Sequence, residues 1–202
     1  MIDLAAHLYD CGNNRHVDFL LECLRDKTWH NLCTIPTRMG IPSIFTDLYY
    51  VYTRKQSSNT IHLVVEQGND VWAAYVCVSV QGSTAEIMGG VAPAFSDRGM
   101  GLACYACLLD QIFSIKPGIQ TIVTKTAECH RTIQRINDVC GFRMVGSVPE
   151  GFYDQETGKR ERLLRYELSR EQHPTAFVLR LCTRFHVRID RDAFTQLKEI
   201  DG

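Results

Sequence analysis

The chain has 202 residues, of which 45% are hydrophobic and 22% charged, and its formal net charge is −1. This length and composition predict one globular domain, with room for an appendage. The near-neutral charge does not indicate nucleic-acid binding, and no apolar run approaches the roughly 20 residues that a membrane-spanning helix needs.

The first third of the chain is expected to be helical and then irregular. Asn13 and Asn14 can cap a helix. Its apolar positions recur at helical spacing on one face: Val17, Leu20, Leu21 and Leu24. A loop is expected to follow, because the next segment carries helix-breaking residues. These are Pro36, Gly40 and Pro42.

Three strands are predicted in the middle of the chain, over residues 60–67, 71–81 and 84–91. The connections at 68–70 and 82–83 are short and contain glycine. Short turns between strands favour an antiparallel meander.

The second half of the chain alternates between helical and extended patterns. Helices are predicted over residues 99–114 and 126–140, and strands over 119–124, 142–148 and 162–168. Gly141 stands where a C-terminal helix cap belongs. This order predicts an α+β fold with a central, mostly antiparallel sheet flanked by helices.

Residues 170–202 are expected to form a helical C-terminal extension beyond a domain of residues 1–169. Phe177, Leu181 and Phe185 recur at helical spacing there. They are expected to face the body of the protein or a second subunit, which makes a homodimer one possibility.

Nine cysteines, an odd number, occur without a basic and apolar leader at the start of the chain. This predicts free thiols in a reducing, cytoplasmic compartment. Cys104 and Cys107 lie inside a helical pattern and have no second pair at zinc-finger spacing, so we expect core packing and no metal site.

The segment over residues 89–101 joins the end of a predicted strand to the start of a helix. A helix start offers unpaired amides and a positive dipole end, which together favour an anion. Gly99 and Gly101 allow close backbone approach, and Arg98 adds charge. The segment therefore predicts a phosphate or pyrophosphate site, although glycines can also serve only a tight turn.

This arrangement resembles the GNAT N-acetyltransferase superfamily over residues 60–168. The resemblance is carried by Val91-x-Pro93, by residues 98–101 and by Gly141-Phe142. It implies acetyl-CoA as the cofactor, with Gly90 and Val91 along its pantetheine arm. It implies a pyrophosphate held at Arg98, Gly99, Met100, Gly101, Leu102 and Ala103.

The match departs from the family motif at two places. Aligned through Pro93 and Gly99, the first motif position holds Ser96, whereas a register shifted to Arg98 satisfies the motif at the same turn. On the second helix, His130 and Asn137 stand where the family often carries Asn and an acid-catalytic Tyr.

Asn137 cannot donate a proton as a phenol does, but it can hydrogen-bond the thiolate or a bridging water. His130 is expected either to contact the coenzyme or to lie exposed on its helix. Glu86, on the same strand face as Met88 and Gly90, is the candidate general base, with a surface glutamate as the alternative. Glu66 is a second, weaker candidate.

We therefore expect an N-acetyltransferase in which an amine of a small molecule or protein attacks acetyl-CoA directly in a ternary complex. Two alternatives stay open. One is an acyl or aminoacyl transferase acting on another acceptor, such as a nucleobase. The other is a non-catalytic module that retains coenzyme binding.

Overall fold

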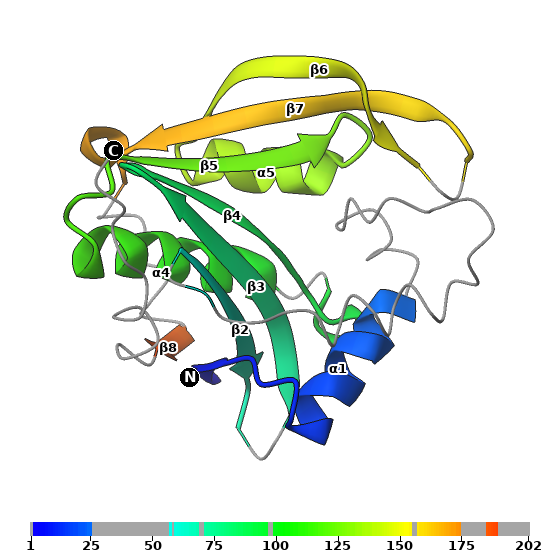
Figure 1. Cartoon of the computed structure of the whole chain (residues 1–202), viewed down its shortest axis with the longest axis vertical. Helices are drawn as coiled ribbons and strands as arrows, with labels where there is room; N and C mark the ends of the chain where they lie inside the picture. Colours follow the sequence, from blue (N-terminus) through cyan, green and yellow to red (C-terminus); the bar gives the residue numbers. More distant parts are fainter. Residues whose placement is uncertain are drawn as a thin grey trace.

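The protein is built on one eight-stranded sheet in the order β6-β7-β5-β4-β3-β2-β1-β8 (Figure 1). The computed structural model describes residues 2–25, 57, 59–68, 71–96, 99–154, 157–174 and 185–189. The strands are β1 (Ile2–Leu8), β2 (Thr60–Glu66), β3 (Trp72–Gln81), β4 (Thr84–Val91), β5 (Thr121–Ala127), β6 (Arg143–Tyr153), β7 (Arg160–Ser169) and β8 (Phe185–Ile189). The predicted mostly antiparallel sheet is confirmed, because only the β4–β5 and β1–β8 pairs are parallel among the described strands.

Helices cover both faces of the sheet. The three α-helices are α1 (Asn14–Arg25), α4 (Met100–Ile115) and α5 (Arg131–Val139) among the described residues. Strand side chains at alternate positions point to opposite faces. Ile61, Val78 and Ile87 face the core that contains α4, whereas Val64 and Tyr75 face the cluster around α1.

The predicted first helix is confirmed, and its cap explains where it starts. The Asn13 side-chain oxygen accepts a hydrogen bond from the Arg15 amide at 3.0 Å. Such a cap satisfies one of the amides that a helix start leaves unpaired. Val17, Leu20 and Leu24 are buried, so the apolar face packs against the sheet as the spacing indicates.

The predicted meander over β2, β3 and β4 is also confirmed. β3 and β4 pair without a register shift from Gln81↔Thr84 to Ala74↔Val91. No bulge therefore interrupts β4 at Gly89. The β3 backbone lies close to this glycine, because a Cβ on Gly89 would overlap the Tyr75 carbonyl oxygen and the Val76 Cα.

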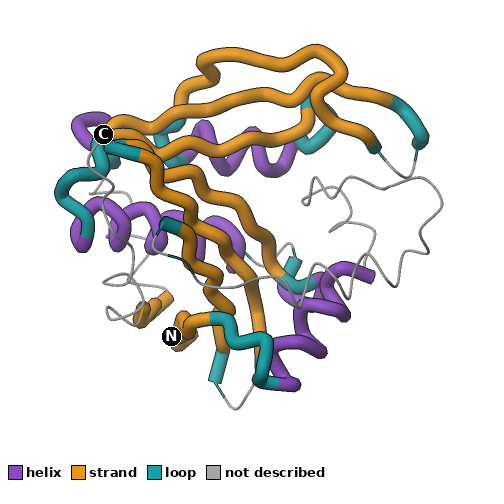
Figure 2. The backbone as a smooth tube through the Cα atoms, viewed as in Figure 1, coloured by secondary structure: helices purple, strands orange, loops and turns teal. Residues whose placement is uncertain are grey.

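β4 and β5 stay together over only three residues and then separate. Their pairing runs from Thr84↔Thr121 to Glu86↔Val123. Beyond it, β4 remains bound to β3, while β5 continues along β7 to Ala127↔Leu163. Figure 2 shows the strands close together at one end and diverging into two groups. The sheet is thus split between two parallel strands, closed at Glu86 and open beyond it.

Two expectations at the ends of the chain are wrong. The structure begins with a strand, β1, within the first third of the chain, which was expected to be helical and then irregular. Residues 185–189 are the strand β8, not part of a helical extension. Phe185, Val187 and Ile189 alternate with polar residues, and parallel pairing to β1 favours that two-residue period over the helical one.

The other differences are shifts of element bounds. β5 extends to Ala127 and α5 starts at Arg131, five residues later than the predicted helix, because a turn at Glu128 and Cys129 separates them. The predicted loop around Pro36 and the remaining parts of the C-terminal extension lie outside the described residues.

Candidate functional site

The split between β4 and β5 has a helix start on each side of its open end. β4 ends at Val91 and leads through a short 3-10 turn (Pro93–Phe95) into α4. β5 ends at Ala127 and leads into α5. Because β4 and β5 are parallel, both helix starts follow the same ends of the two strands. A ligand lying in the split would therefore meet both.

The start of α4 has the features of an anion site. Gly99 precedes the helix with φ 73° and ψ 0°, in the left-handed region that glycine adopts without strain. Its carbonyl accepts the Ala103 amide at 3.1 Å. The amides before Ala103 therefore precede the first intrahelical bond and are available to a ligand. The N-cap residue, Gly99, has no side chain that could cap this end of α4.

The predicted cofactor-binding residues of this turn lie together, apart from Arg98, which is outside the described residues. Met100 and Ala103 are buried and Leu102 is partly buried, so their side chains pack into the protein. The backbone amides of the first turn point toward the helix start, as in any helix. A Cβ on Gly101 would lie 3.6 Å from Val91 Cγ1. A methyl group at this position would therefore lie in ordinary van der Waals contact with Val91.

Gly90 and Val91 lie on the β4 edge of the split. On one side they pair with Tyr75 and Ala74 of β3. On the other side β5 has already separated, because its pairing with β4 ends at Glu86. The main chain of β4 thus runs along the open part of the split, where the resemblance places the pantetheine arm.

Glu86 lies at the closed end of the split. Its carboxylate binds Lys125 of β5, with both oxygens 2.9 Å from Nζ. The two side chains are 46% and 39% exposed, so the carboxylate is accessible from solvent. Glu66 lies on β2, two strands away from the split, and its carboxylate is 3.2 Å from His7 Nε2. The geometry therefore favours Glu86 over Glu66 as the candidate general base.

Asn137 lies on the opposite face of the sheet from Glu86, in the core between the two helices. It is completely buried, and its Oδ1 accepts a hydrogen bond from Tyr105 Oη of α4 at 3.2 Å. The Asn137 Nδ2 has no hydrogen-bond partner among the described residues. Its side chain therefore offers an unused donor inside the protein.

His130 caps the start of α5 at the open end of the split. Its ring packs edge-on against Phe152 of β6, with centroids 5.6 Å apart. Burial lowers the pKa of His130, while Asp154 and Glu161 oppose that shift. One of the two expectations was that His130 lies exposed on its helix. The ring is instead half-buried against the β6–β7 hairpin.

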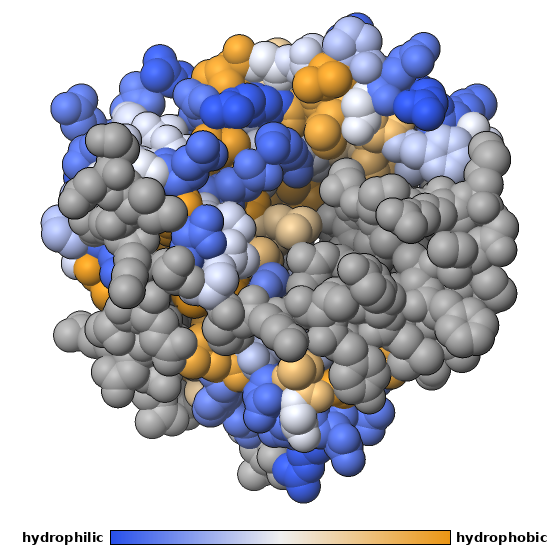
Figure 3. Space-filling view, in the orientation of Figure 1, coloured by the Kyte–Doolittle hydropathy of each residue, from blue (hydrophilic) through white to orange (hydrophobic). Residues whose placement is uncertain are grey.

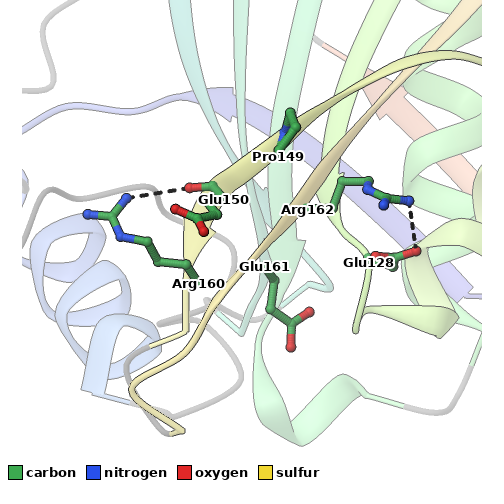
Figure 4. Close-up of a pocket in the computed structure, with 6 residues that line it drawn as sticks. All are labelled: Glu128, Pro149, Glu150, Arg160, Glu161 and Arg162. Atoms are coloured by element: carbon green, nitrogen blue, oxygen red, sulfur yellow. Dashed lines mark hydrogen bonds and ion pairs between the residues drawn. The ribbon is translucent and has the colours of Figure 1, made fainter.

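A separate charged hollow of about 390 Å³ lies beside the β5–α5 turn (Figure 4). It is lined by Glu128, Pro149, Glu150, Arg160, Glu161 and Arg162. Arg162 pairs with Glu128 at 3.6 Å, and Arg160 binds the Glu150 carbonyl oxygen at 3.5 Å. The arginines are thus already partnered by neighbouring oxygens, and hydrophilic side chains cover much of this part of the surface (Figure 3).

The described part of the chain contains no cluster of His, Cys, Asp and Glu that could hold a metal ion, and Cys104 and Cys107 are buried in the core as expected. Within the same residues, no helix has the length and apolar character required to cross a bilayer.

Sequence reasoning missed three residues at the split. Lys125 interrupts an otherwise apolar strand, which could have indicated a partner for a nearby carboxylate. Tyr105 and Thr124 carry hydroxyls on apolar faces of α4 and β5. A buried hydroxyl needs a partner, but spacing along the chain does not identify Asn137 as that partner.

Comparisons with known proteins agree with this architecture. Neither protein-family models nor curated protein sequences gave a match. Among solved structures, the fold is that of the GNAT N-acetyltransferases. One is the spermidine N-acetyltransferase from Vibrio cholerae in complex with CoA and spermine, with a TM-score of 0.67 and 16% identity over 84% of this chain and 96% of that one.

A second similar structure is an acetyltransferase of the GNAT family from Streptococcus pneumoniae. Its TM-score is 0.60, with 14% identity over 82% of this chain and 99% of that one. A chimera of the Vibrio cholerae enzyme has a TM-score of 0.64 and 16% identity over 83% of this chain and 96% of its own. The fold expected from the resemblance is therefore confirmed.

Proposed function

We propose that this protein is an acetyl-CoA-dependent N-acetyltransferase that transfers an acetyl group to an amine. The observation that carries the proposal is the split between β4 and β5, with the uncapped start of α4 at its open end. The likeness to the Vibrio cholerae structure, which contains CoA and spermine, supports it.

The coenzyme would lie with its pyrophosphate at the start of α4 and its pantetheine arm along β4. The amides from Gly99 to Ala103 would donate to the pyrophosphate, with Arg98 adding positive charge. Gly90 and Val91 would offer main-chain groups to the arm. His130, on the far side of the open end, would border the coenzyme from α5.

In the reaction, the amine nitrogen attacks the thioester carbonyl carbon and loses a proton to Glu86. The carbon–sulfur bond then breaks, and its electron pair goes to sulfur. Glu86 and Asn137 lie on opposite faces of the sheet at the split. The acceptor would therefore approach from the Glu86 face, while the sulfur departs toward the face of α4 and α5.

The acceptor we propose is a primary amine on a small molecule, because the similar structures include an enzyme bound to spermine. A panel of labelled amines, with polyamines and lysine peptides among them, would identify the acceptor. Coenzyme binding without turnover on any amine would instead indicate a binding module.

Gly101→Leu provides the direct test of coenzyme placement. The leucine side chain would fill the space beside Val91 at the helix start, so CoA affinity should fall at least tenfold in calorimetry. Gly146→Leu is the matched control, because a Cβ there meets no atom within 4 Å. If the unmodified protein fails to bind CoA at millimolar concentration, the proposed function is wrong.

A further inference from the structure

Thr124, Tyr105 and Asn137 form a largely buried chain of hydrogen bonds that links β5, α4 and α5. Tyr105 Oη donates to Asn137 Oδ1 at 3.2 Å. Burial raises the pKa of the Tyr105 phenol, and a hydrogen bond with the Thr124 side chain opposes that rise. The phenol has a single hydrogen and gives it to Asn137, so the Thr124 hydroxyl is the donor in the bond with Tyr105. The donors therefore run in one direction, from Thr124 through Tyr105 to Asn137.

The hydrogen-bond chain ends at the Asn137 Nδ2 donor, for which no described residue provides an acceptor. Asn137 is 0% exposed, and its Nδ2 has no hydrogen-bond partner. In the part of the protein that the structure describes, the only other buried side-chain atom of this kind is His173 Nδ1. Because buried polar groups are normally paired, an unpaired amide nitrogen at this place calls for a ligand or a functional role.

Backbone and ring contacts hold Asn137 and Tyr105 in place. The Phe142 amide donates to the Asn137 carbonyl at 2.9 Å and the Gly141 amide donates to the Asp138 carbonyl at 3.1 Å. These two bonds make a Schellman motif at the end of α5. The Phe142 ring stacks on Tyr105 with centroids 5.8 Å apart. The side-chain amide is therefore fixed before any ligand arrives.

This hydrogen-bond chain lies beside the closed end of the split. Thr124 directly follows Val123, the last β5 residue that pairs with β4. Tyr105 is on the second turn of α4, the helix whose start is the proposed pyrophosphate site. A pantetheine arm that runs from that start along β4 to the closed end of the split would end beside this hydrogen-bond chain.

We propose that Tyr105 is a positioning residue that, with Thr124, orients Asn137 so that Nδ2 donates a hydrogen bond to the coenzyme sulfur. This inference rests on the proposed function. When the carbon–sulfur bond breaks, sulfur takes the electron pair, and Nδ2–H stabilises the thiolate without giving up its proton. The thiolate is protonated later by water.

Calorimetry with CoA and desulfo-CoA, in which hydrogen replaces the thiol, tests this at pH 9 without knowledge of the acceptor. The unmodified protein should bind CoA on the order of tenfold more tightly than desulfo-CoA, because a hydrogen bond to a charged atom is involved. Asn137→Leu should reduce that ratio to about one, and Tyr105→Phe and Thr124→Val should reduce it in part. The affinity for desulfo-CoA should stay within about twofold.

Tyr75→Phe is the matched control. It removes a buried hydroxyl that forms a hydrogen bond with His62 Nδ1 at 2.7 Å, on the α1 face of the sheet and away from Asn137. This variant should keep the full ratio. If the ratio of the CoA and desulfo-CoA affinities were the same in the unmodified protein, Asn137→Leu and Tyr105→Phe, the inference would be wrong. Coenzyme binding, and with it the proposed function, would still stand. Failure of the unmodified protein to bind either ligand would instead reject the proposed function.

Discussion

At the scale of single residues, the split brings together groups that are far apart in the chain. Glu86 meets Lys125, and Asn137 meets Tyr105. The first pair is exposed and the second is largely buried, so they contribute to stability in different ways. An exposed ion pair contributes little, whereas an unpaired polar atom in a core costs about 1–3 kcal/mol.

Glu86→Gln should separate activity from stability. Removing the proton acceptor should lower the rate of acetyl transfer about 100-fold or more. The free energy of unfolding, measured in urea, should change by less than about 1 kcal/mol, because the Lys125 pair is exposed. Glu167→Gln, which breaks the similarly exposed pair with Arg165, should leave the rate unchanged. Full activity of Glu86→Gln would show that another group accepts the proton.

Asn137→Leu should cost less stability than Tyr105→Phe. The leucine removes the unpaired Nδ2, and the Tyr105 hydroxyl can then turn to donate to the Thr124 oxygen, whereas the phenylalanine leaves the buried Asn137 Oδ1 without its donor. We expect Tyr105→Phe to lower the free energy of unfolding by about 1–3 kcal/mol. In a protein that already carries Asn137→Leu, the same change should cost about 1 kcal/mol less. Additive effects in urea unfolding would contradict a Tyr105–Asn137 bond.

At the scale of elements, α1 is attached to the sheet through a buried histidine. His16 Nδ1 accepts the Asp10 amide at 3.0 Å, and the ring packs against Trp72 with centroids 4.7 Å apart. Burial lowers the pKa of His16 below its ordinary value of 6.5, although Asp10 opposes the shift. The folded protein thus prefers the neutral ring, which the accepted hydrogen bond requires.

Stability should therefore fall as the pH drops below about 6.5, because the unfolded chain then binds a proton that the folded chain takes up less readily. His16→Gln keeps a side chain that can accept a hydrogen bond but cannot titrate. The loss of unfolding free energy between about pH 7 and pH 5 should be smaller in this variant. His130→Gln removes a second histidine with a lowered pKa and provides the comparison. If the unfolding free energy of His16→Gln depended on pH as steeply as that of the unmodified protein, His16 would not be a source of the pH dependence.

At the scale of the whole molecule, the C-terminal segment completes the sheet. β8 pairs with β1 in parallel from Ile2↔Phe185 to Ala6↔Ile189. Leu4 and Ala6 of β1 belong to the core beside α4. At least residues 185–189 are therefore part of the main sheet, and the boundary predicted at residue 169 remains a prediction.

A chain that ends at residue 174 should unfold at a lower urea concentration than one that ends at residue 190, since only the longer chain retains β8. The shorter chain should also self-associate, because β1 then presents an unpaired edge. Gel filtration over a range of protein concentrations measures this. Equal midpoints and equal elution volumes would show that β8 does not stabilise the body. A dimer that needs residues 191–202 would appear only in the full chain.

Much of the fold follows from local patterns in the sequence. Alternation predicts β2, β3 and β4, Asn13 predicts the start of α1, and Gly141 predicts the end of α5. The start of α4 after Gly99 is also local, since a left-handed residue there requires glycine. For that reason the proposed pyrophosphate site could be located from sequence.

The tertiary structure decided what depends on contacts between distant segments. β8 is a strand because β1 offers it an edge to pair with. Of the residues at helical spacing, Phe185 lies in β8, and there the pairing with β1 outweighs the helical pattern. Likewise, Glu86 meets Lys125 because β4 and β5 lie side by side, and Asn137 meets Tyr105 because α4 and α5 pack against the same core. Periodicity reports which face a side chain takes, whereas pairing between strands determines which side chains meet across it.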